Sequence, residues 1–103
     1  MPSYNKLVRD KIPEIIENSG KTADNHILNE DEYILELDRK LNEECAEYQA
    51  DKSIEELADM LEVMYAIVDA RGYSVAELEK IRKEKAEKRG GFKNRIFLEK
   101  VDD

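Results

Sequence analysis

The sequence predicts an all-α fold, a helical bundle around an antiparallel helix hairpin, with short extended N- and C-terminal segments. Charged residues make up 41% of the chain, against only 4 Gly and 2 Pro, and this composition favours helices over a sheet-rich fold. Apolar residues also recur at three- and four-residue spacing in several stretches. The length of 103 residues is that of one domain, expected to span residues 1–103.

The N-terminal segment is expected to begin extended at Tyr4 and then to turn into a short helix. Asp10 can cap this helix, Pro13 is tolerated in a first helical turn, and Gly20 is expected to end it. Residues 21–30 lack a helical period and are expected to form a loop.

The first long helix is expected over residues 31–51. A three- and four-residue spacing gives it an apolar stripe, made of Ile34, Leu37, Leu41 and Tyr48. The position that continues this stripe between Leu41 and Tyr48 is occupied by Glu44. A carboxylate on the core-facing side is costly to bury unless it is paired, protonated or bound to a metal.

The second long helix is expected over residues 53–71, opened by a capping box of Ser53 with Glu56 and ended by Gly72. Capping is therefore an alternative role for Glu56. Apolar residues cover most of the circumference and leave a narrow polar strip, made of Asp59, Glu62 and Asp69. We expect this helix to be central and to contact neighbours on several sides.

A further capping box, Ser74 with Glu77, is expected to open a helix that ends near Arg89, before two glycines. Its apolar residues, expected to face inward, are Val75, Leu78 and Ile81. Residues 92–101 are expected to form a loop with a short extended piece, 96–98, that could pair with the N-terminal arm.

Charge and composition exclude several classes of function. The net charge of −8, from 17 basic and 25 acidic residues, argues against general binding to nucleic acid or to anionic membranes. The charge is segregated: residues 29–62 hold 13 acidic and 3 basic side chains, whereas residues 80–100 hold 9 basic and 3 acidic ones. A single cysteine, Cys45, and the lack of a long apolar run or signal peptide lead us to expect a cytoplasmic protein without membrane contact.

The two long helices should bring four carboxylates together. In an antiparallel hairpin about residues 51–52, Glu44 faces Asp59 and Glu47 faces Glu56. Four negative charges this close repel strongly, and Mg²⁺, or Mn²⁺ as an alternative, would relieve the repulsion. Such ions commonly take substrate phosphate oxygens as further ligands. The competing interpretation is a solvated acidic helix face without a metal.

The same residues resemble a known signature. Residues 40–47 and 55–62 are similar to the E-x-x-E and E-x-x-D motifs of the all-α nucleoside triphosphate pyrophosphohydrolases, the MazG and phosphoribosyl-ATP pyrophosphohydrolase superfamily. Residues 4–13 and 84–92 resemble the two ends of a small MazG-like branch often labelled phosphoribosyl-ATP pyrophosphohydrolase-like. The likeness covers nearly the whole chain.

The resemblance implies a MazG-like helical bundle that assembles as a homodimer or higher homo-oligomer. It implies hydrolysis of a nucleoside triphosphate between the α and β phosphates, giving the monophosphate and pyrophosphate. The Mg²⁺ ligands would be Glu44, Glu47, Glu56 and Asp59, and Glu47 or Glu43 would be the catalytic base. The candidates for holding the β and γ phosphates are basic: Arg9, Lys11, Arg82, Lys85, Lys88 and Arg89.

Two other functions remain open at this level. The shared motif does not separate nucleotide house-cleaning from hydrolysis of phosphoribosyl-ATP in histidine biosynthesis. A non-catalytic helical module that binds a nucleotide or a protein partner would also explain the apolar surface of residues 53–71.

Overall fold

The protein is described here by a computed structural model that covers residues 4–102, in which every regular element is an α-helix. The chain forms α1 (Ile12–Asn18), α2 (Glu30–Asp51), α3 (Ile54–Ala70) and α4 (Val75–Arg89). The predicted all-α class is confirmed. Residues 1–3 and 103, which belong to the predicted single domain, lie outside the described residues.

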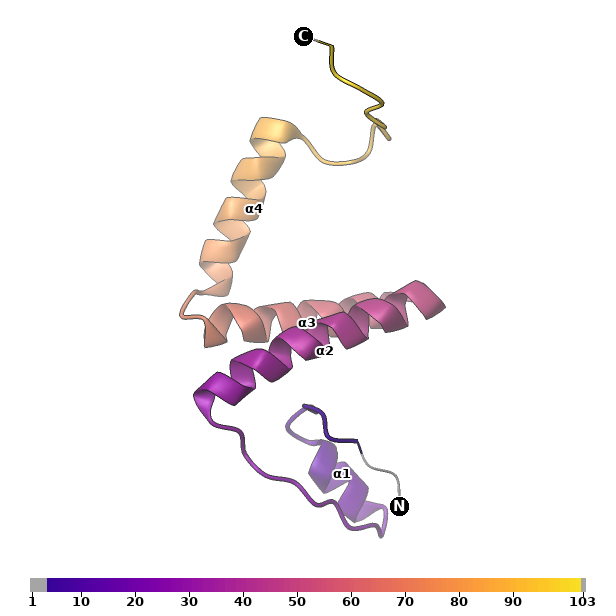
Figure 1. The fold of residues 1–103 in the computed structure, drawn as a ribbon, viewed down its shortest axis with the longest axis vertical. Helices are drawn as coiled ribbons and strands as arrows, with labels where there is room; N and C mark the ends of the chain where they lie inside the picture. Colours follow the sequence, from indigo (N-terminus) through magenta and orange to yellow (C-terminus); the bar gives the residue numbers. More distant parts are fainter. Residues whose placement is uncertain (1–3, 103) are drawn as a thin grey trace.

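The centre of the molecule is a hairpin of α2 and α3, which pack side by side (Figure 1). Only Lys52 and Ser53 separate the two helices, so the chain must reverse at once. Lys52 ends α2 in the left-handed conformation, at φ 61°, and its N–H donates to the carbonyl of Tyr48. The Ser53 side chain then accepts from the Glu56 N–H and opens α3.

The first turn of α2 has a feature that the sequence interpretation missed. Asn29 and Glu32 form a reciprocal capping box, so the helix begins one residue earlier than expected. The predicted box of Ser74 with Glu77 forms at the start of α4, and that helix ends at Arg89 as predicted.

The core lies between α2 and α3 and is small. Leu37 and Val63 are buried in it, and the rest of the predicted α2 stripe, Ile34, Leu41 and Tyr48, is half-buried. Glu44 is buried among these residues with 6% of its surface exposed. The periodicity therefore located the inward face of α2 correctly, including its one carboxylate.

The arrangement of α4 differs from the prediction. Figure 1 shows α4 leaving the hairpin at its junction with α3, and α4 has no close backbone approach to α2. Val75 and Ile81, expected to face inward, are 41% and 53% exposed, while Leu78 is half-buried. The α3 helix packs along α2 and meets α4 only beside their junction, so part of its apolar surface stays exposed.

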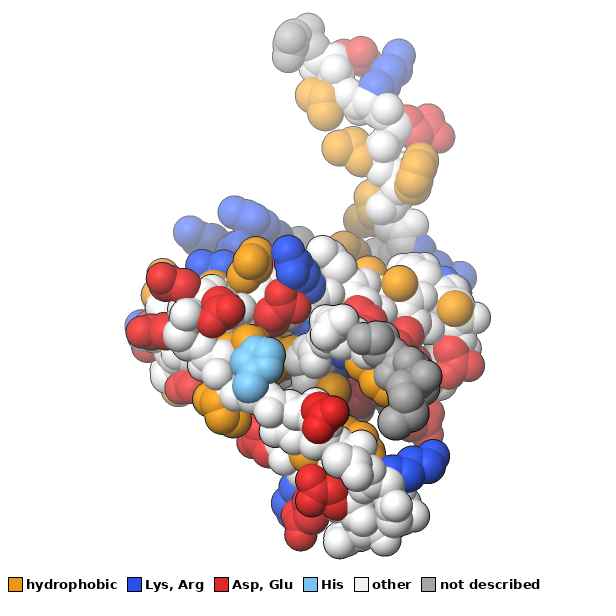
Figure 2. All heavy atoms as spheres, turned by 60° about the horizontal axis from the view of Figure 1, so that its bottom comes forward, with side chains coloured by type: hydrophobic (Ala, Val, Ile, Leu, Met, Phe, Trp, Pro, Cys, Tyr) orange, Lys and Arg blue, Asp and Glu red, His pale blue; other side chains and the backbone are white. Residues whose placement is uncertain are grey.

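The chain is more extended than a compact domain of its length. Its radius of gyration is 18.3 Å, and its principal extents are 62 × 31 × 24 Å. A compact domain of about 100 residues has a radius of gyration of about 13 Å. The excess arises from α4 and the segment after it, whose apolar side chains project from the body in Figure 2. The exposed apolar residues of that segment are Phe92, Ile96, Phe97, Leu98 and Val101.

Two predictions about the chain ends are wrong. Asp10 does not cap α1, because the residue at the N-cap is Lys11, whose backbone is already helical and whose side chain makes no capping bond. The segment 96–98 does not pair with the N-terminal arm, since α4 carries it to the opposite end of the molecule, and no strand forms within residues 4–102 (Figure 1). No helix in the described part of the chain is both long enough and apolar enough to span a membrane.

Candidate metal centre

The site begins with the buried carboxylate of Glu44 on α2. Its Oε1 atom lies 3.4 Å from Lys40 Nζ, one turn earlier on the same helix. Its Oε2 atom is buried and has no hydrogen-bond partner among the described residues. Burial raises the pKa of Glu44, the charge of Glu47 raises it further, and Lys40 opposes both effects. The folded chain therefore holds this anion in an unfavourable position.

The α3 helix adds Glu56 and Asp59 to the same place. One oxygen from each of these carboxylates and one from Glu44 all lie within 4.8 Å of one another. The predicted approach of Glu44 and Asp59 across the hairpin is therefore present in the structure. Three carboxylates from two helices offer oxygen ligands of the kind that Mg²⁺ and Mn²⁺ prefer.

Glu56 is not occupied by the capping role that the sequence left open. The Glu56 N–H donates to Ser53 Oγ at 3.4 Å, but the Glu56 carboxylate does not return a bond to the Ser53 N–H. At α4 the equivalent bond from the Ser74 N–H to the Glu77 carboxylate is present, at 3.2 Å. Instead, Glu56 Oε2 is buried without a partner within residues 4–102. The Glu56 carboxylate can therefore act as an oxygen ligand in the cluster with Glu44 and Asp59.

Glu43 and Glu47 form a second group with Glu44 along α2, again with one oxygen from each within 4.8 Å. Glu47 is exposed. The hairpin predicted from the sequence places Glu47 opposite Glu56. In the structure, the cluster with members on both helices contains Glu44, Glu56 and Asp59, and Glu47 is not part of it. A side chain at the core-facing position reaches α3 more directly than one placed near the solvent edge.

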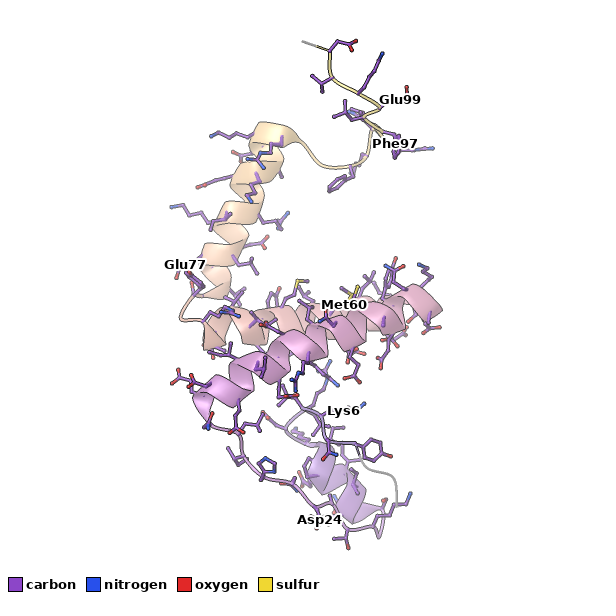
Figure 3. All side chains as sticks on the ribbon, viewed as in Figure 1. Lys6, Asp24, Met60, Glu77, Phe97 and Glu99 are labelled. Carbon is purple, nitrogen blue, oxygen red and sulfur yellow. The ribbon has the colours of Figure 1, made fainter. Side chains whose placement is uncertain are left out.

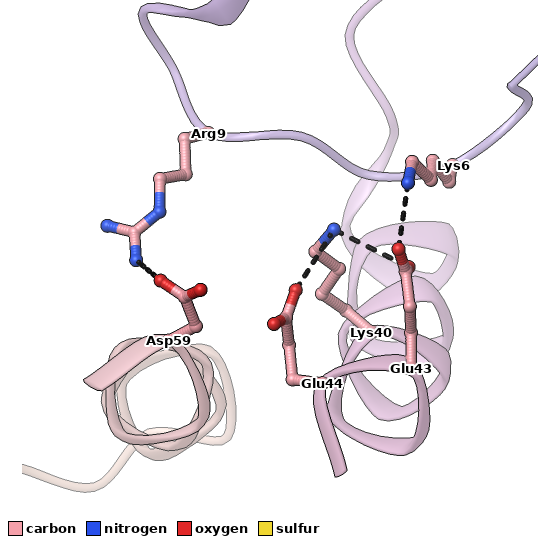
Figure 4. A network of polar contacts seen from close by, with 6 residues as sticks. All are labelled: Lys6, Arg9, Lys40, Glu43, Glu44 and Asp59. Atoms are coloured by element: carbon pink, nitrogen blue, oxygen red, sulfur yellow. Dashed lines mark hydrogen bonds and ion pairs between the residues drawn. The ribbon is translucent and has the colours of Figure 1, made fainter. Parts of the chain in front are cut away.

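The N-terminal arm, residues 4–11, supplies two cations to this region. Lys6 Nζ lies 2.8 Å from Glu43 Oε1 on α2, and an Arg9 guanidinium nitrogen lies 2.7 Å from Asp59 Oδ1 on α3 (Figure 4). In Figure 3 the labelled Lys6 lies beside the hairpin, far from Phe97 at the other end of the molecule. The hydrogen bond from Lys6 is the main reason that the pKa of Glu43 is lowered.

The sequence interpretation did not include Lys6 or Lys40 among the site residues. Lys40 could have been found, because it precedes Glu43 and Glu44 by three and four residues, the spacing of neighbours on a helix. Lys6 could not, because its partner lies 37 residues away and no local pattern fixes the course of the arm.

The charges around the site suit a divalent cation. The five carboxylates are accompanied by three paired cations, which leaves two negative charges when every carboxylate is ionised. Two buried carboxylate oxygens lack partners in the described structure. Oxygen donors, an uncompensated charge of two and unpartnered buried oxygens together fit Mg²⁺ or Mn²⁺. The five carboxylates belong to Glu43, Glu44, Glu47, Glu56 and Asp59, and the three cations are Lys6, Arg9 and Lys40.

The predicted phosphate-binding residues are divided between two places. Arg9 is at the carboxylate cluster, and Lys11 is exposed without a side-chain partner in the described part of the chain. The other four lie on α4, which projects away from the cluster, so one chain does not bring them to it. Arg82 pairs with Glu79, while Lys85, Lys88 and Arg89 are exposed along α4.

Comparisons with known proteins give little further information. No protein-family model and no solved structure matches the chain. A protein of Mycolicibacterium smegmatis described as uncharacterized is 53% identical over 45 residues. That match covers 44% of this chain and 46% of the relative, so it spans about half the length of either.

Replacing Glu44 by Gln should stabilise the metal-free protein at neutral pH. The pKa of Glu44 is raised above 4.5 in the folded protein, so the folded state holds the Glu44 proton more tightly than the unfolded state does. The stability that this gives is fully present below pH 4.5 and is lost as the pH rises through the pKa of the folded state. We expect Glu44→Gln to increase the free energy of unfolding at pH 7 by about 1 kcal/mol. The advantage should vanish below pH 4.5.

Thermal unfolding in EDTA between pH 4 and pH 8 measures this difference. Glu62→Gln, which removes an exposed carboxylate from α3, is the matched control and should change the stability little at any pH. A Glu44→Gln variant less stable than the unsubstituted protein at pH 7 would show that burial does not disfavour this charge.

Proposed function

We propose that this protein is a Mg²⁺-dependent nucleoside triphosphate pyrophosphohydrolase that cleaves between the α and β phosphates and removes unwanted nucleotides. The observation that carries the proposal is the Glu44 carboxylate. It is buried, one of its oxygens is unpartnered within the described residues, and the group shares a 4.8 Å cluster with Glu56 and Asp59. The resemblance of the two motifs supplies the reaction class.

Glu44, Glu56 and Asp59 would hold the ion. When bound, Mg²⁺ supplies positive charge for the phosphoryl oxygens and acidifies a water ligand. The work of the chain is to hold these carboxylates close together at a half-buried place. Partial exclusion of water strengthens each of these electrostatic interactions.

Glu47 is the better candidate for the residue that accepts the proton of the attacking water. Glu43 is the weaker base of the two candidates, because the hydrogen bond that it accepts from Lys6 lowers the pKa of its carboxyl. Glu47 is exposed and forms no ion pair with a lysine or arginine of residues 4–102. It also belongs to the group that contains Glu43 and Glu44, close to the metal ligands.

A second copy of the chain would complete the site. The α3 helix leaves Leu57, Leu61 and Met64 exposed at helical spacing, an apolar face suited to another subunit. The basic residues of α4 and the acidic cluster carry opposite charges but do not meet within one chain. In the homo-oligomer that we propose, α4 of one subunit would place Arg82, Lys85, Lys88 and Arg89 toward the phosphates bound by another.

The activity test is a screen of nucleoside triphosphates and phosphoribosyl-ATP with Mg²⁺, assayed for release of pyrophosphate. We expect turnover of at least one nucleoside triphosphate, and a loss of about 100-fold in Asp59→Asn because a metal ligand is removed. Asp69→Asn makes the same chemical change at an exposed position on α3 and should retain the activity.

Equal activity in Asp59→Asn and Asp69→Asn would contradict the assigned site. Lack of turnover on every substrate would contradict the enzymatic proposal and favour a non-catalytic module. Turnover of phosphoribosyl-ATP alone would assign the protein to the histidine pathway.

Mixing two inactive variants tests whether the site is shared. Glu44→Gln disables the carboxylates, and the double variant Lys85→Met, Lys88→Met disables α4. After subunit exchange, statistical pairing in a dimer should restore about a quarter of the original activity, because half of the dimers are mixed and each mixed dimer holds one intact site. A monomer by light scattering, or no recovery in mixtures that do exchange subunits, would contradict the shared site.

A further inference from the structure

The N-terminal arm is tied to both helices that form the carboxylate cluster. Lys6 bonds to Glu43 on α2, and Arg9 bonds to Asp59 on α3 (Figure 4). Helix α1, which follows the arm, makes no close backbone approach to another helix within residues 4–102. These two ion pairs join the arm to both helices of the hairpin.

A divalent cation and Arg9 would compete for the same carboxylate. Asp59 Oδ1 is 2.7 Å from the guanidinium, and an oxygen of Asp59 also belongs to the group with Glu44 and Glu56. An ion within this group would lie only a few ångströms from the guanidinium. Like charges at such a distance repel, and the repulsion is stronger beside a half-buried site than in water.

Lys6 is placed similarly on the other helix. It pairs with Glu43, and the neighbouring charges of Glu47 and Glu44 also attract it. Lys40 differs from both arm residues, because it is mostly buried and reaches its partners from the same helix. A cation bound by Glu44 would weaken the electrostatic attraction between the carboxylates and Lys6. Lys40 would stay near the carboxylates, because it lies on the same helix as Glu43 and Glu44.

We propose that the arm is an internal counter-ion of the carboxylate centre: Lys6 and Arg9 neutralise it before the metal binds, the divalent cation displaces them, and the released side chains then contact the polyphosphate. This inference rests on the proposed function, since it takes the cluster to be a metal site. It adds an order of events, in which the metal precedes the phosphates, and it assigns Lys6 to phosphate binding.

The exposure of the pairs suits such an exchange of partners. The side chains of Arg9 and Asp59 are 58% and 39% exposed. Surface ion pairs of this kind contribute little net stability, so the arm can leave its carboxylates at small cost. A polyphosphate anion offers the same cations several oxygens and a larger opposite charge.

Metal affinity of the full chain, without nucleotide, is the first measurement. Isothermal titration with Mn²⁺ should show tighter binding to Lys6→Met and to Arg9→Met, by about two- to fivefold each, since each loses one competing pair. Lys21→Met removes an equal charge from a residue that has no side-chain partner in the described structure, and it should match the unsubstituted protein.

Affinity for inorganic tripolyphosphate at saturating Mg²⁺ is the second measurement, and its sign should be opposite. Lys6→Met and Arg9→Met should bind tripolyphosphate several-fold more weakly than Lys21→Met, because they lack the released cations. Hydrogen exchange of residues 4–11 supplies an independent readout, and Mn²⁺ alone should accelerate it.

The outcomes separate this inference from the proposed function. If no form of the protein binds Mn²⁺, both are overturned. If Mn²⁺ binds but the arm variants bind it as Lys21→Met does or more weakly, the counter-ion role is wrong and the metal site stands. Slower exchange of residues 4–11 with Mn²⁺ would likewise overturn displacement of the arm.

Discussion

The burial of one carboxylate, that of Glu44, is the constraint on which the rest of the site depends. An ionised carboxylate within a helix pair is costly unless other groups compensate its charge. Lys40 compensates it only in part, since it lies 3.4 Å from one oxygen and the other oxygen is unpartnered among the described residues. The chain thus keeps an anion where a hydrophobic residue would stabilise the hairpin, which is typical of a functional position.

The features around Glu44 form one electrostatic system. The α3 helix directs Glu56 and Asp59 at the same place, and the N-terminal arm returns to the hairpin to supply Lys6 and Arg9. Each cation in the system is matched to a carboxylate, yet the carboxylates outnumber the cations by two charges. A divalent cation and an anionic substrate would satisfy these groups together more completely than the chain does alone.

Sequence reasoning could predict what depends on neighbours along one helix. The inward position of Glu44 follows from the spacing of Leu37, Leu41 and Tyr48, and the box at Ser74 follows from a local pattern. It could not predict what depends on the path of the chain between elements. The contacts of Lys6 and Arg9 span 37 and 50 residues, and α4 takes an outward course that leaves Val75 and Ile81 exposed.

The most direct test of the proposed metal site is to locate a bound cation by anomalous scattering from crystals of the protein grown with Mn²⁺. We expect an anomalous peak coordinated by oxygens of Glu44, Glu56 and Asp59, with Arg9 no longer bonded to Asp59. Crystals that bind Mn²⁺ elsewhere, or that leave Glu44 Oε2 without a ligand at saturating Mn²⁺, would contradict it.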